Sequence, residues 1–301
     1  MSTQPQPIEP DDNEEFNEEE FIPGHLIRET FSFFDFNQRT LNRDVRQMEV
    51  ILDRRSAREL VNLYYDLQKS RLAYNNQVRD LKKAESPHEL LDYYSNVFHM
   101  LEKSLVGPLD NFGDQYTVGR WAKSQYGIGP VITAGLIAHI DIQKAPTAGS
   151  IWRFAGIDPT LKWNKGEKRP FNGQLKTLTW KIGQSFMKFH NNENCFYGHL
   201  YKMDKERRTA KNEAGDYADF AKEILTTKNW GQNPTRAHLE SGKLPPAQID
   251  AQARRFSAKI FLSHYHAVAY QDFHGVPAPR PYIIEHGGHV HEIPIPNNPF
   301  A

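Results

Sequence analysis

Residues 126–138 read YGIGPVITAGLIA, and this stretch indicates how the centre of the chain folds. Two glycines, Gly127 and Gly129, flank a single apolar residue and allow the backbone to turn tightly. Pro130 then opens a helix rich in small residues, because proline is favoured at the first helical position. With a first helix predicted over residues 118–125, the pattern is typical of a helix-hairpin-helix.

Such a hairpin presents backbone N–H groups, at the turn and at the start of its second helix, to an anion. Contacts of this kind hold nucleic-acid phosphates and carry no sequence information. We therefore expect Gly127 and Gly129 to contact the phosphate backbone, with Arg120, Lys123 and Thr133 beside them. The alternative is a tight turn between two helices that binds no ligand.

The residues after the hairpin predict a short capped helix and then a basic segment. Thr147 is a candidate N-cap for a helix over residues 148–155 that ends at Gly156. Trp163, Phe171 and Trp180 are interleaved with a series of basic residues: Lys162, Lys165, Lys168, Arg169, Lys176, Lys181 and Lys188. Basic and aromatic residues together suit a nucleic-acid groove. The alternative is a solvated basic face over a core that contains Trp180 and Phe186.

Taken together, residues 118–190 resemble the C-terminal transposase domain of the IS-one-ten type insertion-sequence transposases, the DEDD recombinases associated with a guide-like bridge RNA. The resemblance rests on four segments in order: Gly127-Ile128-Gly129-Pro130, Asp141-Ile142, Pro146-Thr147 and Ala155-Gly156-Ile157-Asp158-Pro159. The basic stretch over residues 165–181 follows them. The resemblance implies a helix-hairpin-helix that binds DNA, with structured RNA as a second partner, and a role in DNA recombination and transposition of a mobile element.

Two departures from that family change the expected activity. The family carries an N-terminal RNase-H-like nuclease domain, whereas residues 1–117 predict helices, so we expect no nuclease activity of the chain's own. The family's catalytic serine falls on Thr147, and Ser150 lies one helical turn later. Thr147 and Ser150 are therefore the candidate nucleophiles of an active or partner-dependent recombinase. The alternative is that Thr147 caps a helix and Ser150 packs, and the sequence leaves the question of enzymatic activity open.

The rest of the chain predicts a mainly α protein. Residues 1–24 form an acidic segment expected to be disordered, and residues 25–117 a helical arm or coiled coil. Residues 38–84 contain no Pro or Gly, which indicates one long helix or two helices broken near Arg54. Such an arm either assembles a homo-oligomer or forms an ordinary antiparallel helix pair.

The next helix of the arm has its own boundary signals. Ser86, Pro87 and Glu89 predict a capped helix that ends before Gly107-Pro108.

The C-terminal third predicts a helical accessory region over residues 191–272, with one helix over 246–272, and a Pro/His-rich extended tail over 273–301. His286, His289 and His291 are weak zinc candidates, with or without Cys195 and His199. Zinc needs three or four rigidly held ligands, which a proline-rich tail does not supply. We therefore expect neither a metal nor a cofactor.

Composition and charge narrow the class of protein. The 301 residues contain equal numbers of basic and acidic residues, 37 of each. Eight of the acidic residues lie in residues 1–20 with no Lys or Arg, so the remaining body is basic. An acidic tail on a basic body is a common arrangement in nucleic-acid binders. A single cysteine excludes an internal disulfide and indicates a reducing, cytoplasmic setting. No apolar stretch is long enough for a membrane span, so we expect no membrane partner.

Overall fold

The computed structural model describes residues 28–48, 51–86, 88–164, 166–227, 229–280 and 292–301, and of residues 28–33 it describes the backbone alone. Within these ranges the chain is mainly helical and contains no strand, as predicted. The helices are α1 (Arg28–Gln47), α2 (Arg54–Lys83), α3 (Glu89–Ser104), α4 (Val106–Asp114), α5 (Thr117–Lys123), α6 (Pro130–His139), the short 3-10 helix η1 (Ile142–Lys144), α7 (Ala148–Phe154), α8 (Gly173–Lys188), α9 (Phe196–Glu213), α10 (Ala218–Thr226), α11 (Pro234–Glu240) and α12 (Pro246–His274). The predicted acidic segment over residues 1–24 lies outside the described residues.

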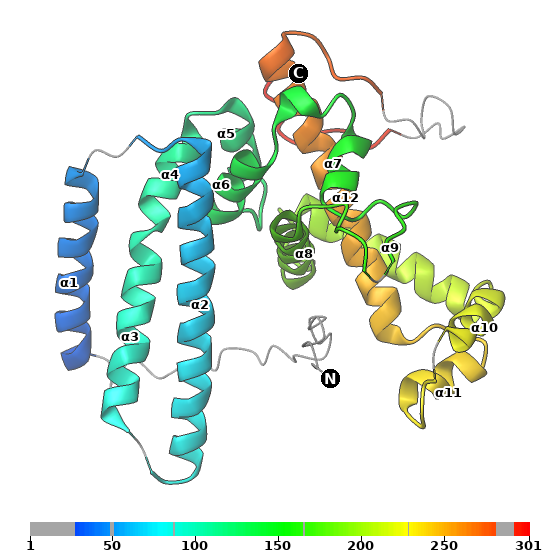
Figure 1. Ribbon diagram of the computed structural model, residues 1–301, viewed down its shortest axis with the longest axis horizontal. Coiled ribbons are helices and arrows are strands. Elements are labelled where there is room, and N and C mark those ends of the chain that lie inside the picture. The colour runs from blue at the N-terminus through cyan, green and yellow to red at the C-terminus, as the bar shows by residue number, and fades with distance from the viewer. Residues whose placement is uncertain (1–27, 49–50, 87, 165, 228, 281–291) are drawn as a thin grey trace.

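The N-terminal helices lie side by side at one end of the molecule (Figure 1). The break between α1 and α2 follows from Asp53, whose carboxylate accepts a hydrogen bond from the Ser56 amide and so caps α2. Helix α2 runs antiparallel to α3, since Arg71 pairs with Glu102 near one end and Lys82 with Asp92 near the other. Helices α2 and α3 therefore form an antiparallel pair, and assembly of a homo-oligomer through these helices stays a prediction.

The predicted start of the next helix is wrong, whereas its predicted end before Gly107 is confirmed, because α3 ends at Ser104. His88, and not Ser86, precedes the first residue of α3, and no side chain caps that helix. Gly107 and Pro108 lie in the first turn of a further helix, α4, which begins directly after Leu105. Proline is compatible with this turn because its missing N–H is one of the groups without an intrahelical partner.

One hydrophobic core holds the N-terminal, central and C-terminal helices together. Its buried members run from Leu52 in the segment before α2 to Ala269 in α12. Helix α6 lies inside this core and is buried from residue 133 to residue 139, as expected for a helix that is apolar on all sides. Trp121 of α5 stacks on Phe261 of α12 with ring centroids 5.5 Å apart. The predicted boundaries at 117 and 190 therefore both fall within a single core.

The accessory region divides where the backbone requires a glycine. The charged segment after Cys195 forms α9 and α10, which are separated at Gly215 with φ +86°. Helices α10, α11 and the start of α12 enclose a small second core of Ala221, Leu239, Leu244 and Ile249.

The described end of the predicted extended tail contacts the core. Helix α12 continues to His274 and ends at Gly275 in the left-handed conformation. Residues 292–301 return to the core, where Trp121 Nε1 donates a hydrogen bond to the carbonyl of Pro296 (2.9 Å) and Ile295 packs against buried side chains.

Candidate nucleic-acid interface

The hairpin has the geometry that the sequence predicts. Helix α5 ends at Lys123, Gly127 adopts φ +94°, and α6 begins at Pro130 with Gly129 as its N-cap. Ser185 of α8 donates a hydrogen bond from its hydroxyl to the carbonyl of Gly127, which ties the turn to the neighbouring helix.

The two glycines of the turn differ in their surroundings. A Cβ added at Gly127 lies 3.0 Å from the Ser185 hydroxyl and 3.4 Å from the Phe189 ring, so this residue is packed against α8. A Cβ added at Gly129 meets no atom within 4 Å. Only Gly129 therefore faces space that an incoming ligand can enter.

A cavity of about 410 Å³ lies where α6 begins. Its walls come from three helices besides the hairpin, and the lining residues are Tyr64, Tyr65, Gln68, Val106, Gly129, Pro130, Val131, Ile132 and Lys181. The first intrahelical bond of α6 runs from the Thr133 amide to the Gly129 carbonyl, so the amides of Val131 and Ile132 precede it. No side chain of the described residues caps these amides, which leaves an anion-binding helix start beside the cavity.

Lys181 supplies the positive charge of this cavity. Its ammonium lies 4.2 Å from the centroid of the Tyr65 ring, and among the described residues no carboxylate lies within 4 Å of it. Burial lowers the pKa of Lys181, and the negative charge of Glu102 acts in the opposite direction. Glu102 itself is buried and neutralised locally, because Arg71 Nε and Gln68 Nε2 donate to its oxygens at 2.7 and 3.1 Å.

The basic side chains predicted beside the hairpin bind other residues of the protein, and the predicted hydroxyl is buried. Lys123 is only 18% exposed and pairs with both Asp110 and Asp114, so it offers little free charge. Arg120 is exposed but donates to the hydroxyl of Thr117 at 3.1 Å. Thr133 is fully buried and its hydroxyl has no hydrogen-bond partner within the described ranges, so it is not a surface contact. The prediction is corrected at Thr133, whose side chain is buried, whereas the role of Lys123 in binding stays a prediction.

The predicted basic residues of residues 157–172, here called the basic loop, lie on the surface. Lys162, Lys168 and Arg169 are exposed, as is Lys176 in the first turn of α8, whereas Lys165 lies outside the described residues. Trp180 is 46% exposed, which contradicts the alternative that places it in the core, while Phe186 is fully buried.

Thr147 performs the capping role that the pattern predicts. Its hydroxyl accepts a hydrogen bond from the Ser150 amide (3.3 Å) and lies 3.1 Å from the Ser150 hydroxyl, at the start of α7. The helix ends at Phe154, and Gly156 follows with φ +65°. Catalysis by either hydroxyl stays a prediction.

The metal candidates fall mostly outside the structure. His286, His289 and His291 are outside the described residues. Cys195 is buried, which raises the pKa of its thiol, and its sulfur donates to the carbonyl of Tyr126 at 3.5 Å. His199 is exposed. Within the part of the chain that the structure describes, no three metal-binding side chains gather.

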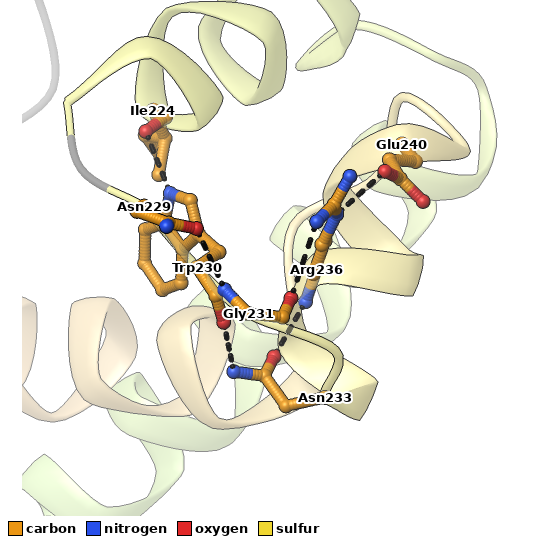
Figure 2. Close-up of polar contacts among 7 residues, drawn as sticks. All are labelled: Ile224, Asn229, Trp230, Gly231, Asn233, Arg236 and Glu240. Atoms are coloured by element: carbon orange, nitrogen blue, oxygen red, sulfur yellow. Dashed lines mark hydrogen bonds and ion pairs between the residues drawn. The ribbon is translucent and has the colours of Figure 1, made fainter.

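A second hollow of about 280 Å³ lies between α10 and α11, lined by Leu225, Asn229, Trp230, Arg236 and Glu240. Figure 2 shows how its polar groups bond to one another. Arg236 donates to the Glu240 carboxylate at 2.7 Å, and Trp230 Nε1 donates to the carbonyl of Ile224 at 3.1 Å. Asn233 accepts from the Arg236 amide and donates to the Trp230 carbonyl. The polar groups around the hollow are therefore bonded to one another, and we interpret the hollow as part of the structure of the connection between α10 and α11.

Sequence reasoning missed the cavity walls. Tyr64, Tyr65 and Gln68 come from α2, more than 50 residues before the hairpin, and no motif links them to it. Lys181 belongs to the predicted basic series, but its position in the cavity depends on how α8 packs beside α6.

Comparisons of this chain with protein-family models, with curated proteins and with solved structures gave no match. Among the described residues, no helix combines the length and the apolar character that a membrane crossing requires.

Proposed function

We propose that this protein binds nucleic acid through its phosphate backbone, at the cavity where α6 begins and along the basic loop. The observation that carries the proposal is the convergence of Gly129, the uncapped amides of α6 and the unpaired Lys181 on one cavity. Each of these groups favours an anion, and together they provide close approach, hydrogen-bond donors and charge.

The resemblance to IS-one-ten type transposases supports DNA as the first partner and structured RNA as the second. The family's nuclease domain precedes its hairpin, whereas helices α1 to α4 precede the hairpin of this chain. This difference favours a transposase-derived binding protein over a nuclease. Phosphate contacts of this kind are independent of base sequence and weaken steeply with salt.

Titration of the protein against labelled duplex DNA and hairpin RNA at several salt concentrations tests the proposal. We expect log K to fall linearly with log salt, and Gly129→Val to weaken binding about ten-fold for all sequences alike. Lys181→Met keeps the aliphatic stem and should reduce the magnitude of the salt slope by roughly 0.9 on duplex DNA. Lys144→Met, at a largely exposed lysine of η1, is the matched control.

Two results would contradict this function. One is the absence of binding to either polymer, both for the intact chain and for a chain without residues 1–20. The other is a Gly129→Val effect that depends on base sequence, because phosphate contacts do not read bases.

A second candidate function is assembly through the N-terminal helices. These helices expose large apolar side chains, namely Leu63, Leu72, Leu90, Tyr93 and Tyr94. Leu90 and Tyr94 are four residues apart on α3 and so share one helix face. We propose a homo-oligomer that covers this face. Sedimentation velocity should then show a species larger than a monomer that Leu90→Glu with Tyr94→Glu dissociates, whereas Phe220→Glu on α10 leaves it intact.

A further inference from the structure

The basic loop and the first turn of α8 hold a compact group of aromatic and basic side chains, Trp163, Arg169, Phe171 and Lys176, here called the platform. We infer that the platform binds single-stranded nucleic acid by stacking an unpaired base on Trp163. The inference rests on the proposed function for the class of ligand and shares the cation Arg169 with it, but it adds a role for the Trp163 ring and concerns a different structural state of the polymer.

The rings of the platform are held in place from below. Gly156 has φ +65°, and a Cβ added there would lie 2.6 Å from the Phe171 ring, so this ring packs directly on the glycine backbone. On α8, the ammonium of Lys176 lies 4.6 Å from the centroid of the Phe171 ring. Phe171 is therefore a fixed support for its neighbours.

Trp163 is oriented but not covered. Its indole Nε1 donates to the carbonyl of Glu167 at 2.9 Å, and its ring meets Phe171 edge to face, with centroids 6.1 Å apart and an angle of 82°. The side chain nevertheless stays 43% exposed. An aromatic ring that is rigidly held and open to solvent offers a stacking surface whose conformational freedom is already restricted.

The charge around the platform favours a polyanion. The described residues 157–176 contain four basic side chains and two carboxylates. The basic residues are Lys162, Lys168, Arg169 and Lys176, and the acids are Asp158 and Glu167. Both carboxylates are engaged within the loop. Glu167 accepts from the amide and the side chain of Asn164, and Asp158 accepts from the amide and the hydroxyl of Thr160. These hydrogen bonds lower the pKa of both acids, which stay charged and bound to their own loop.

Arg169 places a positive charge beside both aromatic rings of the platform. Its guanidinium carbon lies 5.6 Å from the centroids of both Trp163 and Phe171. A guanidinium beside an aromatic ring can donate to a phosphate while a base occupies the ring. In a duplex the base faces are already stacked on one another, so this combination selects an unpaired strand or an unpaired loop.

Binding of the full chain to oligothymidylate, to oligouridylate and to a duplex of equal length tests the inference. We expect Trp163→Ala to weaken binding of the single strands about ten-fold and to leave duplex binding unchanged within about two-fold. Trp163→Phe should recover most of the affinity, because a ring is restored. Quenching of tryptophan fluorescence by the single strand should be largely lost in Trp163→Phe.

Matched variants separate stacking from general effects. Phe220→Ala removes an aromatic side chain of equal exposure on α10 and should leave all three affinities unchanged. Arg169→Gln keeps both rings and should weaken single-strand binding with a smaller salt slope. The affinities for oligothymidylate and oligouridylate show whether the platform prefers DNA or RNA, since a stacking site of this chemistry can bind either polymer.

The platform and the hairpin cavity fail in different ways. Duplex binding that Gly129→Val weakens, together with single-strand binding that Trp163→Ala leaves intact, overturns the platform alone. Single-strand binding that Trp163→Ala weakens, together with duplex binding that Gly129→Val leaves intact, supports the platform and contradicts binding at the cavity. Binding to vesicles of anionic lipid that depends on Trp163, without single-strand binding, also overturns the inference, as does the absence of any nucleic-acid binding.

Discussion

The hairpin around Gly127 and the basic loop contain similar residue types but differ in how available those residues are. In the hairpin, Lys123 is paired with two aspartates and Thr133 is buried, so these polar groups near the turn are less available to a ligand. In the basic loop, Lys162, Lys168 and Arg169 are exposed, and the acids bond within the loop. The hairpin, which the sequence motif identifies, is therefore a rigid scaffold. The exposed basic side chains lie instead on the basic loop, which has no regular secondary structure.

The largest expected effect tests the rigidity of the hairpin. A Cβ added at Gly119 of α5 would lie 2.0 Å from the carbonyl oxygen of Gly113, and backbone atoms cannot move aside cheaply. We expect Gly119→Ala to lower the free energy of unfolding by about 3–5 kcal/mol in urea titrations. Gly107→Ala in the adjacent α4 is the control, because its added Cβ meets nothing within 4 Å. Equal stability of the two variants would show that the hairpin is loosely packed.

Local features of the hairpin were predictable because they depend on neighbouring residues. Pro130 and the small apolar residues after it predict α6, and Thr147 predicts its own cap, since both signals act within one helical turn. The break before α2 follows in the same way from Asp53. The transposase resemblance rests on these same local patterns, and it stays a prediction.

Features that depend on distant residues were missed. Asp110 and Asp114 neutralise Lys123 from α4, and Tyr65 of α2 places Lys181 in the cavity. The return of residues 292–301 depends on hydrogen bonds from Trp121 and His264, which no local pattern reveals. Helix α9 illustrates the same limit. Asp204 has the sequence surroundings of a solvated helix face, yet it is buried and bound to Arg207 and Arg208.

Acid should destabilise the core around the hairpin, because two of its buried histidines have lowered pKa values. Burial lowers the pKa of His139, at the end of α6, to about 4, and burial likewise lowers the pKa of His264 to about 4. Unfolding returns both to about 6.5, so between these values the unfolded chain binds more protons and stability falls as pH falls. We expect each histidine to contribute a loss of roughly 2–3 kcal/mol from pH 6.5 to pH 4, measured by urea unfolding.

The matching control for the acid effect is His264→Gln, which should flatten part of this pH dependence because one titrating group is removed. His264 Nε2 donates to the carbonyl of Ile293, and its Nδ1 lies 2.8 Å from the Tyr197 hydroxyl, so the variant also loses some stability at neutral pH. An unchanged slope in His264→Gln would assign the acid sensitivity to other groups.

A smaller effect separates the two glycines of the turn. Gly127→Ala places a side chain at φ +94° and 3.0 Å from Ser185, which should lower the free energy of unfolding by about 1–2 kcal/mol. Gly129→Ala introduces neither strain nor overlap, so its thermal midpoint should match that of the unchanged chain. Calorimetry of the two variants checks this. Equal losses would mean that Gly129 is as closely packed as Gly127.

The smallest effect compares one paired and one exposed lysine. Lys123→Met breaks two ion pairs that are partly exposed, so we expect a loss of about 0.5–1 kcal/mol in stability and an unchanged salt slope for nucleic-acid binding. Lys168→Met in the basic loop should do the reverse, with stability unchanged and the slope reduced in magnitude by roughly 0.7–0.9. The reason is that only a lysine without a protein partner contributes a full charge to a phosphate. If Lys123→Met reduced the slope as much as Lys168→Met, its aspartates would have to release it on binding, and the hairpin would be a charged surface like the loop.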